Sequence, residues 1–229
     1  MAQRRAVKKS AKKTAPAKKT APTKKAAPAK KAAPEKKAAP TKKAAPANKT
    51  APANKTALVG PESHPAFATL TKRLKPGSYA GGLIVITAPG ALDDEMHDWL
   101  MGNVDGRRAI GRTAFGELLV FRDLRERARE LGVGDPDNEA DIALIDVHFK
   151  KMTVLGTSVD TFLEGLDDRD FQEAFLRLSL FDEVKQRLGP CKPNECYGFV
   201  PALALGGSEE PETVQRLDWQ VHQSILLQS

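Results

Sequence analysis

The chain has 229 residues, of which 36 are Lys or Arg and 29 are Asp or Glu, so its formal net charge is +7. The charge is divided sharply along the chain. Residues 1–57 hold 18 basic residues and one acid, a charge of +17, and the remaining residues hold 18 basic residues and 28 acids, a charge of −10. All aromatic residues lie at or beyond Phe67. A basic tail therefore precedes an acidic body that is long enough for one domain with a sizeable core.

The composition excludes several classes of protein. No apolar run is long enough to span a bilayer, and no apolar stretch follows the basic N-terminus as a secretory signal requires. Cys191 and Cys196 are the only cysteines, which is too few for a disulfide scaffold. We therefore expect a cytoplasmic protein in a reducing environment, without contact to a membrane.

From Lys12 the tail repeats a six-residue unit in which two lysines precede Thr or Ala, then Ala and Pro. The tail has almost no large apolar side chains, so residues 1–57 are predicted to be disordered, and the regular prolines favour an extended chain over a helix. Lysine pairs without aromatic residues suit contacts with phosphates that read no sequence. The predicted nucleic-acid-binding residues are Lys12, Lys13, Lys18, Lys19, Lys24, Lys25, Lys30, Lys31, Lys36, Lys37, Lys42 and Lys43.

This repeat resembles the tails of linker histones and of some bacterial nucleoid proteins, which are rich in lysine, alanine and proline. The resemblance implies DNA or RNA as a partner and a location at the nucleoid. A solvated linker is the alternative interpretation of the same composition. The charge pattern alone does not distinguish DNA from RNA or from another polyanion.

The body combines short apolar strands with amphipathic helices, and a polar loop separates its central strands. Strands precede most of the helices, which favours an α+β fold with a small antiparallel sheet and C-terminal helices. We divide the chain into the tail at 1–57, a linker with a short helix at 58–78, and an α+β domain at 79–229. In chain order the predicted elements are a helix at 65–75, a strand at 83–87, a helix at 93–101, strands at 107–113 and 117–122, a loop at 132–141, strands at 142–149 and 152–155, helices at 159–166 and 170–188, and a last helix from Thr213 or Asp218.

Near the C-terminus the chain carries the motif Glu195-Cys196-Tyr197-Gly198-Phe199-Val200-Pro201, followed by Gly206-Gly207. This motif resembles the signature of the C-terminal domain of type VI secretion DNase-immunity proteins. The segments at 111–118 and 158–163 and the closing helix from Val214 fit the same family in the same order, so the resemblance covers about 79–229. In related proteins a GAD-like module precedes this domain, whereas here 65–82 is too short for one and the lysine tail stands in its place.

The resemblance implies a protein that binds and neutralises a toxin, here a basic nuclease that an acidic domain attracts. From the residue types alone, the motif is predicted to be a packed crossover that supports the C-terminal helix, with glycines in conformations closed to other residues. Tyr197, Phe199, Leu203 and Leu205 alternate as half-buried residues do. The predicted structural residues are Glu195, Cys196, Tyr197, Gly198, Phe199, Pro201, Gly206 and Gly207.

The sequence offers little for catalysis or for metal binding. The four histidines have no metal-ligand spacing, and no nucleophile, phosphate-loop or metalloprotease motif occurs. The carboxylates from Asp135 to Asp141 alternate as in a calcium loop, but Ala140 stands where such a loop needs glycine, which favours a solvated acidic turn. We therefore predict no enzymatic activity, no cofactor and no metal.

Three functional hypotheses follow for the chain, and its oligomeric state stays open. The leading one is a non-enzymatic protein that binds a basic toxin through its acidic body. The alternative is a nucleoid-associated DNA-binding protein whose tail is the functional element. In the third, the tail folds back on the acidic body and inhibits it.

Overall fold

The computed structural model describes residues 60–229, so the tail and all the lysines predicted to bind nucleic acid lie outside the described residues. A six-stranded antiparallel sheet has the order β1-β2-β3-β4-β5-β6, and β7 and β8 form a separate antiparallel pair. The predicted α+β class with an antiparallel sheet is confirmed. The strands are β1 (Gly77–Tyr79), β2 (Ile84–Ile86), β3 (Arg107–Thr113), β4 (Leu118–Asp123), β5 (Ala140–Asp146), β6 (Lys151–Gly156), β7 (Glu195–Phe199) and β8 (Val214–Asp218).

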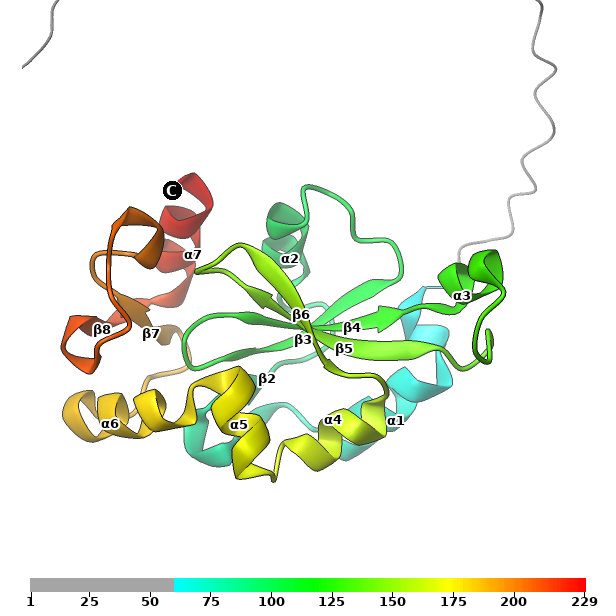
Figure 1. The fold of residues 1–229 in the computed structure, drawn as a ribbon, viewed down its shortest axis with the longest axis horizontal. Helices are drawn as coiled ribbons and strands as arrows, with labels where there is room; N and C mark the ends of the chain where they lie inside the picture. The colour runs from blue at the N-terminus through cyan, green and yellow to red at the C-terminus, as the bar shows by residue number, and fades with distance from the viewer. Residues whose placement is uncertain (1–59) are drawn as a thin grey trace, which may run out of the picture. The chain divides into compact units, whose positions relative to one another are not determined.

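Helices cover both faces of the larger sheet, as Figure 1 shows: α1, α4, α5 and α6 lie on one face and α2 and α7 on the other. Within the described residues, no helix is both long and apolar enough to cross a membrane. The helices are α1 (Pro65–Arg73), α2 (Asp93–Trp99), α3 (Arg125–Leu131), α4 (Val159–Gly165), α5 (Arg169–Leu176), α6 (Leu178–Leu188) and α7 (Trp219–Gln228), with short 3-10 turns at Pro61–Ser63, Ala80–Gly82, Leu203–Leu205 and Pro211–Thr213.

Strand β4 shows why both faces need helices. Successive side chains of a strand point to opposite faces. Leu119 and Phe121 join the core beneath α1, α4 and α6, whereas Leu118 and Val120 join the core beneath α2 and α7. All four side chains are fully buried, so β4 lies at the centre of two cores.

The strands predicted at 107–113, 117–122 and 152–155 match β3, β4 and β6 within one or two residues. The strand predicted at 142–149 ends earlier, at Asp146, because its carboxylate accepts hydrogen bonds from the backbone N–H groups of His148 and Phe149 (3.0 and 3.1 Å) and closes a turn. Strands β1, β7 and β8 and helix α3 were not predicted from the sequence.

Two predicted helices differ from the structure. The helix predicted at 170–188 is two helices, because Arg177 adopts a left-handed conformation (φ 56°) between α5 and α6. The last helix begins at Trp219, where the carboxylate of Asp218 caps it by accepting from Val221 N (3.1 Å), and the preceding residues form β8.

A linker with a short helix was expected at 58–78, and the described residues of this segment, from 60 onward, contribute to the main core. Phe67 and Leu70 of α1 are buried there, and the ring of Phe67 packs edge-on against Phe121 of β4 (5.0 Å). The boundary proposed at residue 79 falls inside β1. The packed part of the chain thus includes residues before that boundary.

Candidate binding surface and the ionic cluster behind it

The C-terminal motif forms β7 and the turn that follows it. Cys196, Tyr197 and Phe199 are buried, and the Tyr197 hydroxyl donates a hydrogen bond to the carbonyl of Gly189 (2.6 Å). The Phe199 ring stacks on Phe115, with 5.9 Å between the centroids. Burial of Cys196 raises the pKa of its thiol to about 12, which keeps it in the unreactive protonated form.

The three motif glycines serve different purposes. Only Gly206 has a left-handed backbone (φ 88°), as expected for a glycine turn. A Cβ at Gly207 would lie 2.0 Å from the backbone oxygen of Pro201, and one at Gly198 would lie 2.8 Å from the His222 ring of α7. Gly198 and Gly207 are therefore needed for space.

The remaining motif residues lie nearer the surface. Glu195 opens β7 and accepts a hydrogen bond from the backbone N–H of Lys192 (3.0 Å). Pro201 follows a cis peptide bond after β7 and is exposed. The alternation of half-buried residues expected from Tyr197 to Leu205 does not reach its last member, because the Leu205 side chain is 63% exposed.

Behind the motif lies a cluster of charged side chains centred on Arg177. Its guanidinium donates to the carboxylate of Glu117, lies 3.5 Å from that of Asp146, and donates to Glu209 (3.0 Å). Glu117 is completely buried and also accepts from the hydroxyl of Thr113 (2.8 Å). The cluster thus joins the β3–β4 turn, the end of β5, the α5–α6 junction and the loop before β8.

Burial and charge act in opposite directions within this cluster. Burial raises the pKa of Glu117 above its ordinary value, and the nearby Arg177 cation offsets only part of this rise. For Arg177, burial lowers the pKa, but the charges of Glu117 and Asp146 outweigh burial and raise it. We conclude that Arg177 stays charged and that its cation favours the ionised form of Glu117, so each group depends on the other for compensation.

Two buried histidines lie beside the cluster. The Nε2 atom of His148 is 3.0 Å from the Phe115 carbonyl oxygen, and its ring contacts His222, with 5.7 Å between the centroids. Burial, with the charge of Arg177, lowers the pKa of His148 to about 4. Burial, with the charge of His148, lowers the pKa of His222 to about 4 as well.

These shifts predict a loss of stability in mild acid. A lowered histidine pKa means that the unfolded chain binds more protons between about pH 6.5 and pH 4, so the stabilisation is complete above pH 6.5 and falls as the pH falls toward 4. The loss should reach about 3 kcal/mol for each histidine. Denaturant unfolding of the double variant His148→Gln/His222→Gln should show a weaker pH dependence than the native chain. His64, whose pKa burial also lowers, should supply part of what remains.

The exposed His97 provides the control for this prediction. His97→Gln should leave the pH profile of the native chain unchanged. Equal pH profiles for the native chain and the double variant would contradict the role given to His148 and His222.

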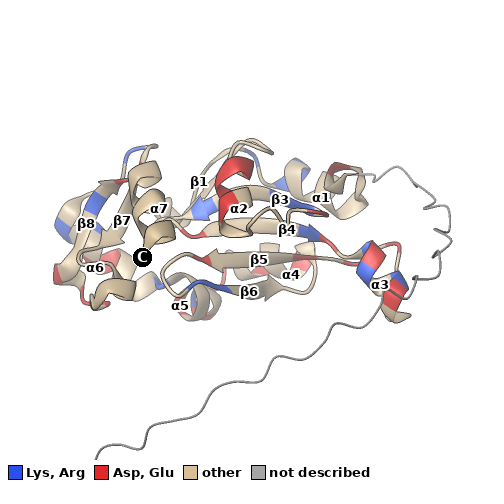
Figure 2. Ribbon diagram, turned by 90° about the horizontal axis from the view of Figure 1, so that it is seen from above, with Lys and Arg blue, Asp and Glu red and all other residues tan. Residues whose placement is uncertain are grey.

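On the opposite side of the motif, α2 and α7 enclose a surface hollow of about 280 Å³. Figure 2 shows acidic residues along α2 beside the uncharged helix α7. The side chain of Gln223 forms the floor: it accepts from the Trp99 indole N–H (2.6 Å) and donates to the Gly116 carbonyl (2.8 Å). The hollow is lined by Asp94, Glu95, Asp98, Trp99, Gln220, Gln223, Ser224 and Leu227.

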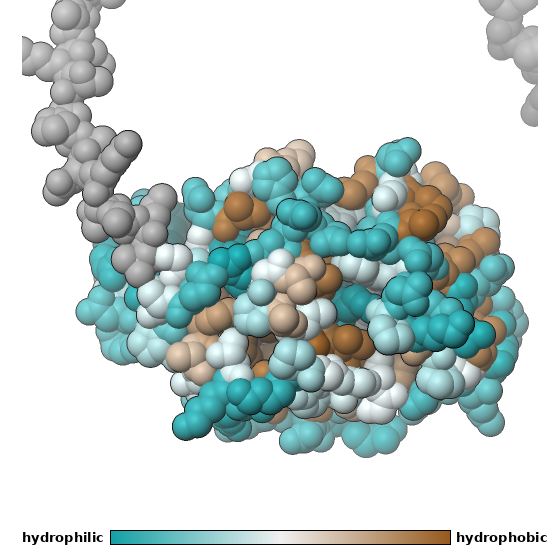
Figure 3. Space-filling model, turned by 180° about the vertical axis from the view of Figure 1, so that it is seen from behind, coloured by the Kyte–Doolittle hydropathy of each residue, from teal (hydrophilic) through white to brown (hydrophobic). Residues whose placement is uncertain are grey.

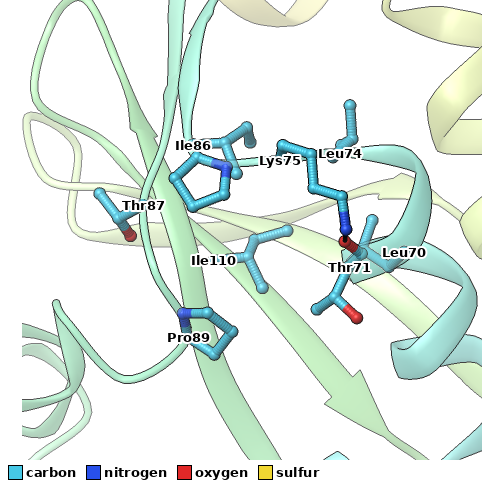
Figure 4. Close-up of a pocket in the computed structure, with 9 residues that line it drawn as sticks. Leu70, Thr71, Leu74, Lys75, Ile86, Thr87, Pro89 and Ile110 are labelled. Atoms are coloured by element: carbon cyan, nitrogen blue, oxygen red, sulfur yellow. Dashed lines mark hydrogen bonds between the residues drawn. The ribbon is translucent and has the colours of Figure 1, made fainter.

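A second, smaller pocket of about 130 Å³ lies between α1 and strands β2 and β3 (Figure 4). Its wall is almost entirely apolar, with Ile86 and Ile110 from the strands and Leu74 from the end of α1. The Lys75 ammonium group donates to the Thr71 carbonyl (3.1 Å) beside the pocket. A pocket of this size and lining accommodates one small apolar group.

Within residues 60–229, no group of three or more His, Cys, Asp or Glu side chains is placed to hold a metal ion. The acidic turn considered for calcium is closed by its own contacts: Asp135 accepts from the Asn138 side chain (2.6 Å), and Asp137 pairs with Arg129 (2.9 Å). The sequence predicted neither the charged cluster nor the hollow. A local signal existed only for the cluster: Glu117 is an acid that directly precedes the apolar run of β4.

Comparison with known proteins supports the motif-based assignment. Residues 156–228 match the family model described as T6SS immunity protein Tdi1, C-terminal. The predicted resemblance to this family is confirmed. The matched region holds α4–α7 and β7–β8, and is shorter than the expected 79–229. It therefore contains α7 and Arg177, while α2 lies outside it.

The likeness in fold extends further than the family match. The crystal structure of Atu4351 from Agrobacterium tumefaciens is similar with a TM-score of 0.52 and 16% sequence identity, over 71% of this chain and 74% of that chain. At this identity the likeness concerns the fold alone. A comparison with curated proteins gave no match.

Proposed function

We propose that this chain is a type VI secretion immunity-like protein that binds a basic toxin, a nuclease by family resemblance, and neutralises it without catalysis. The observation that carries the proposal is the match of residues 156–228 to a family of immunity proteins. After residue 57 the chain has 28 acids against 18 basic residues. This excess of acids supports a basic partner, because electrostatic attraction accelerates the association of oppositely charged proteins.

Native co-purification tests this function. The full chain is recovered from its own cells in several growth states, and we expect one basic protein to accompany it. The Arg177→Met variant, prepared in the same way, should recover less of that basic protein if the substitution destabilises residues 156–228, the region that matches the family model. Recovery of no basic partner in any growth state would contradict the proposed function.

We propose a second activity for the tail, which is binding of nucleic acid through phosphate contacts. The support is the charge of +17 in residues 1–57, with lysine pairs in successive six-residue units. Such a tail would hold an immunity protein near the chromosome that a nuclease attacks. As the alternative function, the tail alone would make the protein nucleoid-associated.

Binding to duplex DNA across a salt series checks the tail. If about ten lysines contact phosphates, the logarithm of affinity should fall against the logarithm of salt concentration with a slope of about −9. A full-length variant with Gln at the twelve predicted lysines should lose this binding, whereas Ser in place of the tail alanines should not change it. DNA binding by the Gln variant equal to that of the native chain would refute the assignment of the tail.

A further inference from the structure

We propose that the hollow between α2 and α7 is the docking surface for a basic segment of a protein partner. In this arrangement a Lys or Arg side chain enters the hollow, and a neighbouring apolar side chain packs on the exposed face of α7. The inference rests on the proposed function, because it places the basic partner on a particular surface of the chain.

The first step concerns the carboxylates of α2. Asp93 is occupied: it forms an ion pair with Arg108 and accepts from the Ala109 backbone N–H (3.1 Å). Among residues 60–229, neither Asp94 nor Glu95 has a cationic partner, and Asp98 approaches only the ring of His97, at 3.8 Å. Three carboxylates of the hollow are therefore available to a cation from outside.

The dipole of α2 explains only part of this charge. Acids in the first turn of a helix are favourable, which accounts for Asp94 and Glu95. Asp98 lies in the last turn, where negative charge is unfavourable, and it is four residues after Asp94, a spacing at which like charges repel. A cation bound in the hollow would relieve both costs.

The second step concerns α7, whose ten residues include no Lys, Arg, Asp or Glu. A surface helix usually carries charged residues on its solvent side. Here that side shows Val221, 59% exposed, and Ile225, 48% exposed, one turn apart. Leu227, 37% exposed, lies on another side of α7, in the lining of the hollow. Figure 3 shows hydrophobic side chains gathered toward the end of the molecule that carries α7.

The floor between the helices is held in place before anything binds. Gln223 is buried and bonded on both sides, to Trp99 of α2 and to the β3–β4 turn at Gly116. The Gln220 side chain lies 3.4 Å from the carboxylate of Glu95 across the hollow. A surface fixed in this way loses little conformational entropy when a partner docks.

These features select a basic protein segment as the occupant. Unpaired carboxylates repel nucleic acid and anionic lipid, and the hollow of about 280 Å³ has room for one or two side chains. Paired acidic and apolar surfaces match a segment that carries cations beside apolar side chains.

Binding of synthetic peptides to the full chain tests the surface by fluorescence anisotropy. The probe is a fluorescein-labelled peptide of lysines and leucines, called the leucine peptide. A second labelled peptide, with serine in place of leucine, is the control probe. Asp94→Asn/Glu95→Gln/Asp98→Asn should weaken binding of the leucine peptide about tenfold. Val221→Ser/Ile225→Ser should weaken binding of the leucine peptide only. The control Glu164→Gln/Asp182→Asn/Glu183→Gln removes equal charge from exposed acids elsewhere and should change affinity less than about twofold.

Three results would overturn the inference. Equal losses in the α2 variant and the control would show attraction by net charge alone. NMR of the free chain across a salt series tests whether the tail fills the hollow. If the resonances of α2 and α7 shift with salt in the native chain, but not in the variant with Gln at the twelve tail lysines, the tail itself is the occupant. Absence of peptide binding while a basic partner still co-purifies would refute this surface and leave the proposed function standing. Peptide binding without any co-purified partner would refute the proposed function instead.

Discussion

Replacing Arg177 by methionine is expected to lower the free energy of unfolding by about 3–5 kcal/mol. The substitution keeps an unbranched side chain but leaves Glu117, which is completely buried, without its compensating cation. Asp146 and Glu209 lose the same partner. Denaturant unfolding at neutral pH measures the effect, and the lost stability should partly return as the pH is lowered and Glu117 takes up a proton.

A matched control separates burial from charge. Arg127 pairs with Glu130 on the surface of α3 (3.1 Å), where both side chains are exposed, so Arg127→Met should cost less than about 1 kcal/mol. A double-mutant cycle with Glu117→Gln should show that the cost of Arg177→Met falls when the buried carboxylate is absent. Equal costs for the two arginine variants would contradict the structural role of the cluster.

Replacing Phe199 by alanine should cost about 3–5 kcal/mol of stability. Its ring is buried, stacks on Phe115, and meets His148 edge-on at 4.9 Å. Because Phe199 ends β7, the cavity would open between the C-terminal motif and the larger sheet. The loss should appear as a lower denaturation midpoint with an unchanged m-value.

Phe149 gives the comparison, since the same substitution there removes a ring that is 50% exposed. Phe149→Ala should change stability by less than about 1 kcal/mol. If Phe199→Ala were as mild as Phe149→Ala, the motif would not pack the C-terminal region against the sheet.

Most elements of the larger sheet could be predicted, because buried strands have continuous apolar runs and turn residues bound them. The short strand β1 shows no such run. The break at Arg177 was not predictable from local signals, since neither glycine nor proline marks it. The apolar repeat continues across the break, and contacts with Glu117, Asp146 and Glu209, distant in sequence, hold the left-handed conformation.

The candidate surface was less visible because two distant segments create it. Asp94, Glu95 and Asp98 are separated from α7 by more than a hundred residues, and at the sequence level acids at a helix start are explained by the helix dipole. The motif from Glu195 to Gly207 predicted the family, but not the reason for its glycines. A side chain at Gly198 would collide with His222, and one at Gly207 with Pro201. Only the folded chain brings these neighbours close to the glycines.

Protection of growing cells tests the central claim most directly. The gene of the basic protein that co-purifies with this chain is expressed in a host with the native chain, with Asp94→Asn/Glu95→Gln/Asp98→Asn, or with the control Glu164→Gln/Asp182→Asn/Glu183→Gln. We expect survival with the native chain and the control, and loss of survival with the α2 variant. A partner that binds the chain yet kills cells equally in its presence and absence would contradict the immunity function.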